Sequence, residues 1–135
     1  MAGSSERWLT LGLIAVAGGA GALSRYGFTL ALGRLHGAEA TVRPLATLGV
    51  NATGCLAFGF FWAAAAGRGD AWSIGRVAVL TGFLGAFTTF STFGFEVASL
   101  LRAGRPAAAL AVVAAQNAIG IAMAWAGIWL GTRAI

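Results

Sequence analysis

Four hydroxyl side chains are interspersed with three phenylalanines at residues 87–93, within the short apolar stretch GFLGAFTTFSTFGFE at residues 82–96. The hydroxyls are those of Thr88, Thr89, Ser91 and Thr92, and the rings are those of Phe87, Phe90 and Phe93. Such hydroxyls bond local carbonyls and compete with the hydrogen bonds of a helix, so the stretch predicts a broken helix. The carbonyls freed by a break suit a bare cation, whereas its amides and hydroxyls suit an anion. We therefore predict an ion site here.

Other polar side chains within apolar stretches are candidates for the same site. Thr47 and Asn51 are four residues apart and share one face of a helix, and Asn51 has two N–H donors. A phenylalanine ring has a positive edge, which attracts an anion without a full charge. Arg25 would bias the local field towards anions. The remaining polar residues of this kind are Glu96, Gln116 and Asn117. The alternative interpretation is that the rings are ordinary core and the hydroxyls bond their own helix.

The composition indicates a helical membrane protein. The chain has 135 residues, of which 59% are hydrophobic and 10% charged, whereas soluble domains have roughly 25% charged residues. A spanning helix needs about 20 apolar residues. We expect an all-α fold with a single transmembrane domain over residues 1–135 and helices at about 8–33, 45–66, 77–101 and 107–131. The first stretch also resembles a secretory signal, but its apolar run continues past Arg25.

The arginines are divided evenly between the two ends of the predicted helices. One side has Arg7, Arg68, Arg76 and Arg133, and the other has Arg34, Arg43, Arg102 and Arg105. An excess of Lys and Arg keeps a loop in the cytoplasm, and this division shows no excess. We therefore expect insertion in both orientations, followed by antiparallel dimerisation. The alternative is an ordinary weak bias, with one orientation set by another feature.

The sequence also favours close helix packing and disfavours two classes of protein. Small residues lie four apart along three of the helices, at Gly18 and Ala22 with Tyr26 on the same stripe, at Ala78, Gly82 and Ala86, and at Gly127 and Gly131. Such spacing lets helices approach closely in lipid. The net charge of +5 is spread singly over the linkers, so no nucleic acid is expected as a partner. No nucleophile with a base and no phosphate-binding loop is recognisable, so we do not expect an enzyme.

Three motifs in order resemble those of the CrcB/Fluc family of fluoride channels. They are GGAGALSRY at 18–26, TLGVNATG at 47–54 and GFLGAFTTFSTFGFE at 82–96, and the resemblance covers nearly the whole chain. It implies a dual-topology antiparallel homodimer with four transmembrane helices per subunit, a broken third helix and two fluoride pores. It also implies a structural sodium ion at the dimer interface, bound by the backbone carbonyls of Gly85 and Thr88. The implied location is the inner (plasma) membrane of a bacterium, as a multi-pass protein in contact with lipid.

The resemblance assigns roles to several polar residues. Phe90 and Phe93 would be the pore phenylalanines, Asn51 a hydrogen-bond donor, and Arg25 and Glu96 the charged residues near the vestibules. Val113 stands where many members have tyrosine, so Asn117 is expected to supply the fourth-helix contact. Ala46 and Ala86 stand where glycine is common. The expected fluoride pore comprises Arg25, Thr47, Asn51, Phe90, Ser91, Thr92, Phe93, Glu96 and Asn117.

The function expected from this resemblance is passive export of fluoride. An alternative is a small multidrug-resistance transporter, which also has four short helices in dual topology. Such transporters exchange protons for cationic drugs through a buried glutamate in the first helix, where this chain has Arg25. A helical scaffold without transport is a third alternative, but it would not need the polar residues at Thr47, Asn51 and positions 88–92.

Overall fold

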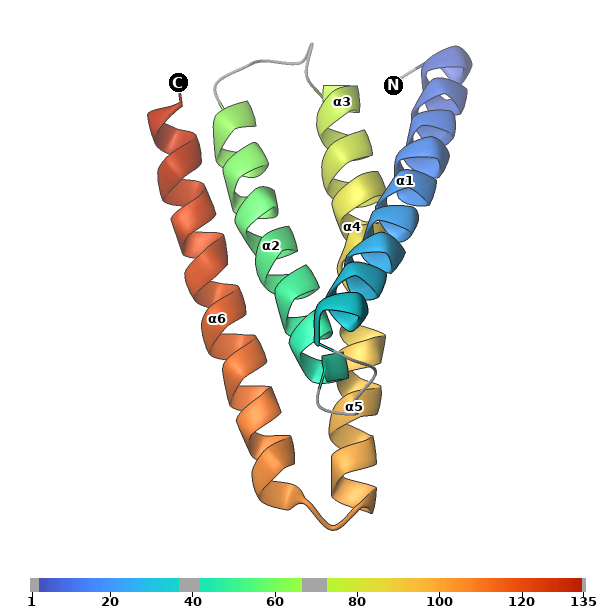
Figure 1. The fold of residues 1–135 in the computed structure, drawn as a ribbon. Helices are drawn as coiled ribbons and strands as arrows, with labels where there is room; N and C mark the ends of the chain where they lie inside the picture. The colour runs from blue at the N-terminus through green and yellow to red at the C-terminus, as the bar shows by residue number, and fades with distance from the viewer. Residues whose placement is uncertain (1–2, 37–41, 67–72, 135) are drawn as a thin grey trace.

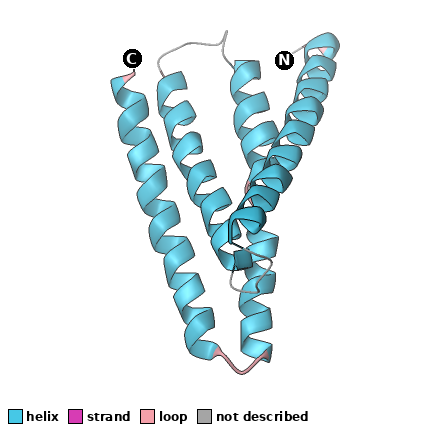
Figure 2. Ribbon diagram, viewed as in Figure 1, coloured by secondary structure: helices cyan, strands magenta, loops and turns pink. Residues whose placement is uncertain are grey.

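The computed structural model describes residues 3–36, 42–66 and 73–134. Within these residues every regular element is helical (Figure 2). The elements are α1 (Ser4–His36), α2 (Val42–Ala65), α3 (Ser73–Val77), the π-helix η2 (Ala78–Leu84), α4 (Gly85–Phe87), α5 (Phe90–Arg102) and α6 (Pro106–Arg133). We refer to α3, η2, α4 and α5 together as the third span.

Four stretches of the described chain are long and apolar enough to cross a membrane. They are Ser4–Arg34, Pro44–Ala65, Ile74–Arg102 and Pro106–Arg133. They lie side by side, with both chain termini at the same end and α1 inclined across the third span (Figure 1). A helix satisfies its own backbone hydrogen bonds, which is why apolar stretches of this length adopt it in lipid. The predicted all-α architecture with four spans is therefore confirmed.

Helices α2 and α6 pack together through glycines. A Cβ atom added at Gly59 would overlap the carbonyl oxygen of Ala124, and one added at Gly127 would overlap the carbonyl oxygen of Leu56. A Cβ at Gly131 would come within 2.9 Å of the Cβ of Ala63. Backbone therefore lies directly against backbone, and this contact fixes the rotation of α6 about its own axis relative to α2.

Helix α1 packs on η2 in the same way, along part of the predicted stripe. Gly18 and Ala22 are half-buried and a Cβ added at Gly18 would lie 3.8 Å from the carbonyl oxygen of Gly82, whereas Tyr26 is 64% exposed. The closest approach is at Gly21, where an added Cβ would overlap the carbonyl oxygen of Phe83. Gly82 of η2 lies against α1 in turn, since a Cβ there would be 2.9 Å from the Cβ of Ala17.

A glycine also forms the turn between α5 and α6. Gly104 has φ +67°, a left-handed conformation that side chains disfavour. Its N–H donates to the carbonyl of Leu101 at 3.0 Å, and the N–H of Arg105 donates to that of Leu100 at 2.9 Å. This pair of hydrogen bonds is the Schellman motif, which ends a helix. Pro106 then begins α6, where its missing N–H has no cost.

Much of the apolar surface of the single chain is open. Leu23 is 72% exposed, Ile121 71% and Trp125 74%, as expected for residues that lie against lipid or another protein. The interior is instead marked by three buried polar residues, Thr47, Thr89 and Glu96. All three lie in α2 or the third span, where the candidate site is found.

Candidate functional site

The third span leaves helical geometry at two residues. Helix α4 ends at Phe87 and α5 begins at Phe90. Between them Thr88 has φ −77° and ψ 159°, and Thr89 has φ −149° and ψ 113°, so both are extended. Threonine is branched at Cβ and favours extended backbone over helix. The N–H of Thr88 still donates to the carbonyl of Leu84 at 3.0 Å, whereas the N–H of Thr89 needs a partner outside the helical ladder.

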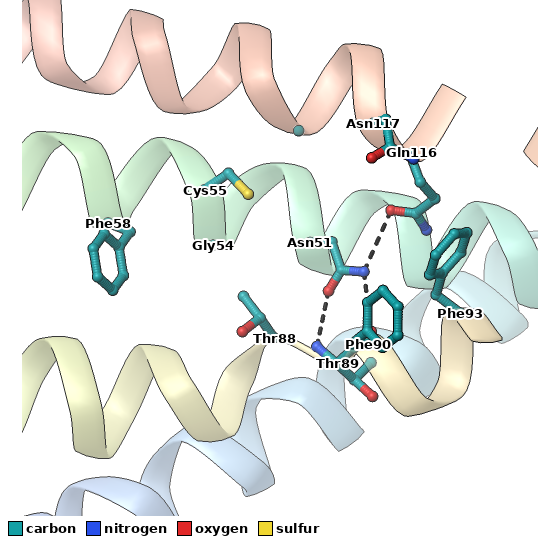
Figure 3. A pocket seen from close by; sticks show the side chains of 11 residues that line it. Asn51, Gly54, Cys55, Phe58, Thr88, Thr89, Phe90, Phe93, Gln116 and Asn117 are labelled. Atoms are coloured by element: carbon teal, nitrogen blue, oxygen red, sulfur yellow. Dashed lines mark hydrogen bonds between the residues drawn. The ribbon is translucent and has the colours of Figure 1, made fainter. Parts of the chain in front are cut away.

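Asn51 supplies this partner for Thr89 (Figure 3). The backbone N–H of Thr89 donates to Asn51 Oδ1 at 2.9 Å. The Asn51 Nδ2 group donates back to the carbonyl oxygen of Thr89 at 3.1 Å, and to Gln116 Oε1 at 3.3 Å. The carboxamide thus pairs with Thr89 as a neighbouring peptide group would in a β-sheet. One side chain of α2 in this way stabilises the interruption of the third span.

The hydroxyls of residues 88–92 bond mainly to the chain around them. Thr88 Oγ1 donates to the carbonyl of Leu84 at 3.0 Å. Thr89 caps α5, because its Oγ1 accepts the N–H of Thr92 at 3.2 Å. The same Oγ1 lies 3.0 Å from Thr92 Oγ1 and 3.3 Å from Ser91 Oγ. A threonine cap of this kind stabilises the start of a helix by about 1 kcal/mol.

Several carbonyls lose their usual helical donors at the interruption, and those of Gly85 and Thr88 are among them. In a continuous helix the N–H of Thr89 would donate to Gly85, and that of Thr92 would donate to Thr88. Here the first N–H is bonded to Asn51 and the second to Thr89 Oγ1. The carbonyl oxygens of Gly85 and Thr88 therefore do not accept these two hydrogen bonds, and backbone oxygens are ligands that a hard cation accepts.

A cavity of about 310 Å³ opens beside the interruption. It is lined by residues of α2, the third span and α6, which are Asn51, Gly54, Cys55, Phe58, Thr88, Thr89, Phe90, Phe93, Gln116, Asn117 and Gly120. The Phe90 and Phe93 rings meet edge to face, with centroids 5.4 Å apart and planes at 69°. Phe90 is 80% exposed, so most of its ring surface remains open to a partner or a ligand.

A second cavity of about 320 Å³ is also lined by Thr89. Its lining residues are Arg25, Thr29, Ala46, Thr47, Val50, Thr89, Thr92 and Glu96. Thr47 Oγ1 donates to Glu96 Oε1 at 2.6 Å, a short hydrogen bond of the kind that a carboxylate accepts. Arg25 and Glu96 therefore lie around one polar cavity, and Thr89 lines both cavities.

The expected pore residues fall into two groups in space. Asn51, Phe90, Phe93 and Asn117 line the first cavity, whereas Arg25, Thr47, Thr92 and Glu96 line the second. Thr47 and Asn51 both bond to the third span, so the face that their spacing predicted is confirmed. Ser91 is exposed and joins the group only through its contact with Thr89.

Two adjacent amides of α6 line the first cavity, the expected Asn117 and also Gln116, but only Gln116 bonds to α2. Asn117 is exposed and its Nδ2 donates to the carbonyl of Val113 in its own helix at 2.8 Å. Gln116 instead accepts the hydrogen bond from Asn51. Adjacent residues of an α-helix point about 100° apart, so only one of these two amides can face α2. The sequence marked Gln116 only as a polar residue within an uncharged apolar stretch.

The fold and the site together define a class of protein. Four spanning helices surround polar groups at an interruption of one span, next to cavities lined by amides, hydroxyls, aromatic rings and one arginine. Irregular backbone at membrane depth is tolerated where it lines a path for ions or solutes. The chain is therefore a polytopic membrane protein with a polar intramembrane site.

The chain belongs to the family described as CrcB-like protein, Camphor Resistance (CrcB), which matches residues 12–128. Three similar proteins are each named Fluoride-specific ion channel FluC. The one from Nitratidesulfovibrio vulgaris is 42% identical over 88% of this chain and 94% of its own length. The one from Solidesulfovibrio magneticus is 44% identical over 90% of this chain and 94% of its own length. The one from Nitrosococcus oceani is 42% identical over 89% of this chain and 94% of its own length. The resemblance read from the three motifs is thus confirmed.

Proposed function

We propose that this protein is a fluoride channel, a multi-pass protein of the bacterial plasma membrane that lets fluoride leave the cell down its electrochemical gradient. The observation that supports this best is the first cavity, where the Phe90 and Phe93 rings lie beside carboxamides and hydroxyls at the interruption of the third span. Membership of the CrcB-like family and the names of the similar proteins support the same conclusion.

The chemistry of the lining suits a small, strongly hydrated anion. Fluoride gives up its water only where donors and positive edges replace it, and N–H, O–H and ring edges all offer positive charge. None of these groups has a full charge, so none would hold the ion too tightly to release it. Arg25 at the second cavity contributes a positive charge that attracts anions, beside the Glu96 carboxyl that lines the same cavity.

We further propose an antiparallel dual-topology homodimer. The balanced arginines support it, and so does the position of the tryptophans. The described tryptophans Trp8, Trp62, Trp125 and Trp129 lie in the parts of α1, α2 and α6 nearest the end that has both termini (Figure 1). Tryptophans anchor a membrane protein at both interfaces. An antiparallel partner would place a second set at the opposite interface, and would cover the exposed Phe90 ring.

A structural sodium ion at the dimer interface is also part of the proposal. The carbonyls of Gly85 and Thr88 fit it, because their usual helical donors are engaged elsewhere. A bound cation would supply positive charge to these oxygens in place of the missing N–H donors. The interruption of the third span would then serve as a cation-binding site. The residues that hold the carbonyls in place are Asn51 and Thr89.

The multidrug-resistance alternative is not favoured. A cation exchanger needs an acidic group for its substrate, but the charged residue in the middle of the first span is Arg25, and the acidic residue Glu6 lies in the first turn of α1. Glu96 lies in the third span and accepts a hydrogen bond from Thr47. A scaffold without transport would not require the two polar cavities.

The test is fluoride efflux from liposomes that contain the purified protein, measured with a fluoride electrode and with chloride as the control anion. We expect rapid fluoride efflux, little chloride efflux, and no efflux from protein-free liposomes. Absence of fluoride efflux from monodisperse, folded protein would overturn the proposed function. A reversal potential that follows the sodium gradient instead of the fluoride gradient would overturn passive conduction.

A further inference from the structure

The first-span motif GGAGALSRY, residues 18–26, meets the third span just before its interruption. Helix α1 crosses the third span beside η2 and α4 (Figure 1). Gly21 is buried, and a Cβ added there would overlap the carbonyl oxygen of Phe83. Gly19 of the same motif is exposed, and an added Cβ would have no neighbour within 4 Å. The contact at Gly21 is with backbone, so any side chain larger than hydrogen must displace η2 itself.

The segment that α1 contacts is a π-helix. In η2, Ala78–Leu84, the backbone is wider than in an α-helix. The N–H of Gly85, at its end, donates to the carbonyl of Leu80 five residues earlier and to that of Gly82. Such helices are rare, and they occur mostly as single turns at functional sites. We infer that the close contact with α1 stabilises this uncommon backbone.

The same contact leads directly to the carbonyls that fit the sodium ion. The Phe83 ring stacks on that of Phe87 across the boundary between η2 and α4, with centroids 6.0 Å apart and planes at 7°. The N–H of Thr88 donates to the carbonyl of Leu84, the last residue of η2, at 3.0 Å. Gly85 lies between these contacts and is itself bonded to η2. A shift of η2 would therefore move the carbonyls of Gly85 and Thr88 together.

We propose that Gly21 is a positioning residue for the sodium site, because through Phe83 it sets where η2 ends and where the carbonyls of Gly85 and Thr88 lie. This inference rests on the sodium ion of the proposed function. A backbone ligand has no rotamers with which to follow an ion, so its position depends on the packing behind it. Helix α1 would then contribute to cation binding, although Gly21 itself would not contact the ion.

Three substitutions and one rescue separate this role from ordinary packing. Gly21→Ala adds a methyl group against the carbonyl of Phe83. Gly82→Ala disturbs the same interface more mildly, since its Cβ would lie 2.9 Å from the Cβ of Ala17. Adding Ala17→Gly to Gly82→Ala removes this closest contact. Gly19→Ala is the matched control, because it makes the same exchange in the same helix, with the same gain in helix propensity, in open space.

The experiment measures thermal unfolding of each full-length protein, purified in N-methylglucamine chloride and titrated with sodium chloride. An ion that binds the native state raises the melting temperature as its concentration rises. Loss of a group that orients metal ligands typically weakens binding by about 10-fold to 100-fold. The sodium concentration for half of this rise should therefore increase by about tenfold or more in Gly21→Ala. It should increase less in Gly82→Ala, return towards the wild type when Ala17→Gly is added, and stay unchanged in Gly19→Ala.

Each outcome decides the question. A sodium dependence within about twofold of the wild type in both Gly21→Ala and Gly82→Ala would overturn the inference, even if both proteins melt at lower temperature. A shift in Gly19→Ala as large as that in Gly21→Ala would overturn it too. If Gly21→Ala does not fold, Gly82→Ala and its rescue give the result. Wild-type stability that ignores sodium would overturn the sodium site and this inference together, while fluoride efflux from the same protein would leave the proposed channel standing.

Discussion

Helix α2 has two faces that make different kinds of contact with its neighbours. Towards α6 it presents Gly59 and small residues, and backbone lies on backbone. Towards the third span it presents Thr47 and Asn51, which make directed hydrogen bonds to Glu96 and Thr89. The first face depends on shape alone, whereas the second depends on the orientation of polar atoms. We infer that the glycine face holds the scaffold and the polar face serves the ion, and that substitutions can separate the two.

The largest effect is expected on the glycine face. Gly127→Leu would place a side chain where the carbonyl of Leu56 lies, so α2 and α6 would have to separate. We expect loss of folded dimer, measured by gel filtration and yield. Gly120→Ala is the matched control on the same helix, because an added Cβ there would lie 3.7 Å from Cys55 Sγ, an ordinary contact. A folded, monodisperse Gly127→Leu protein would contradict the scaffold role of this face.

The next effect concerns the rings of the first cavity. Phe93→Ile and Phe90→Ile keep an apolar side chain and remove the ring edge. We expect fluoride efflux to fall by about tenfold or more in each, the equivalent of roughly 1.4 kcal/mol of lost ion stabilisation, with a normal gel-filtration profile. Unchanged efflux in both variants would mean that the rings are ordinary packing residues.

A smaller and reversible effect is expected when sodium is replaced by a large organic cation. Carbonyls of Gly85 and Thr88 left without a partner would cost about 1 to 3 kcal/mol each, which should lower dimer stability and fluoride efflux. Both should recover when sodium returns, and the reversal potential should follow fluoride throughout. Stability and efflux that do not depend on sodium would contradict the proposed ion site.

The last prediction tests the contact between Gly54 of α2 and Thr88 of the third span. A Cβ added at Gly54 would overlap Cγ2 of Thr88, so Gly54→Ala should destabilise the dimer by about 1 to 3 kcal/mol. Thr88→Ser removes that methyl and keeps the hydroxyl and the carbonyl, so alone it should be mild. The double variant should regain most of the lost stability, as measured by thermal unfolding. If the double variant is no more stable than Gly54→Ala alone, the contact with the Thr88 methyl is not the cause of the destabilisation.

The sequence by itself determined the class of fold and the family. Long uncharged stretches can satisfy their backbone in lipid only as helices, so the four spans followed from composition. The spacing of Thr47 and Asn51 determined that they share a face, because a helix has a fixed period. Hydroxyls next to phenylalanines at residues 87–93 marked the site, because polar atoms are costly at that depth.

Only the tertiary structure decided which partner each polar atom meets. Gln116 and Asn117 are equivalent in the sequence, and the contact of Gly127 with α2 sets the rotation of α6 that turns Gln116 inward. Any asparagine side chain has two N–H donors. In the folded chain, the carbonyl of the extended Thr89 accepts one of those of Asn51 and Gln116 Oε1 accepts the other. Hydrogen bonds depend on distance and direction between segments far apart in the chain, and those quantities exist only once the helices are packed.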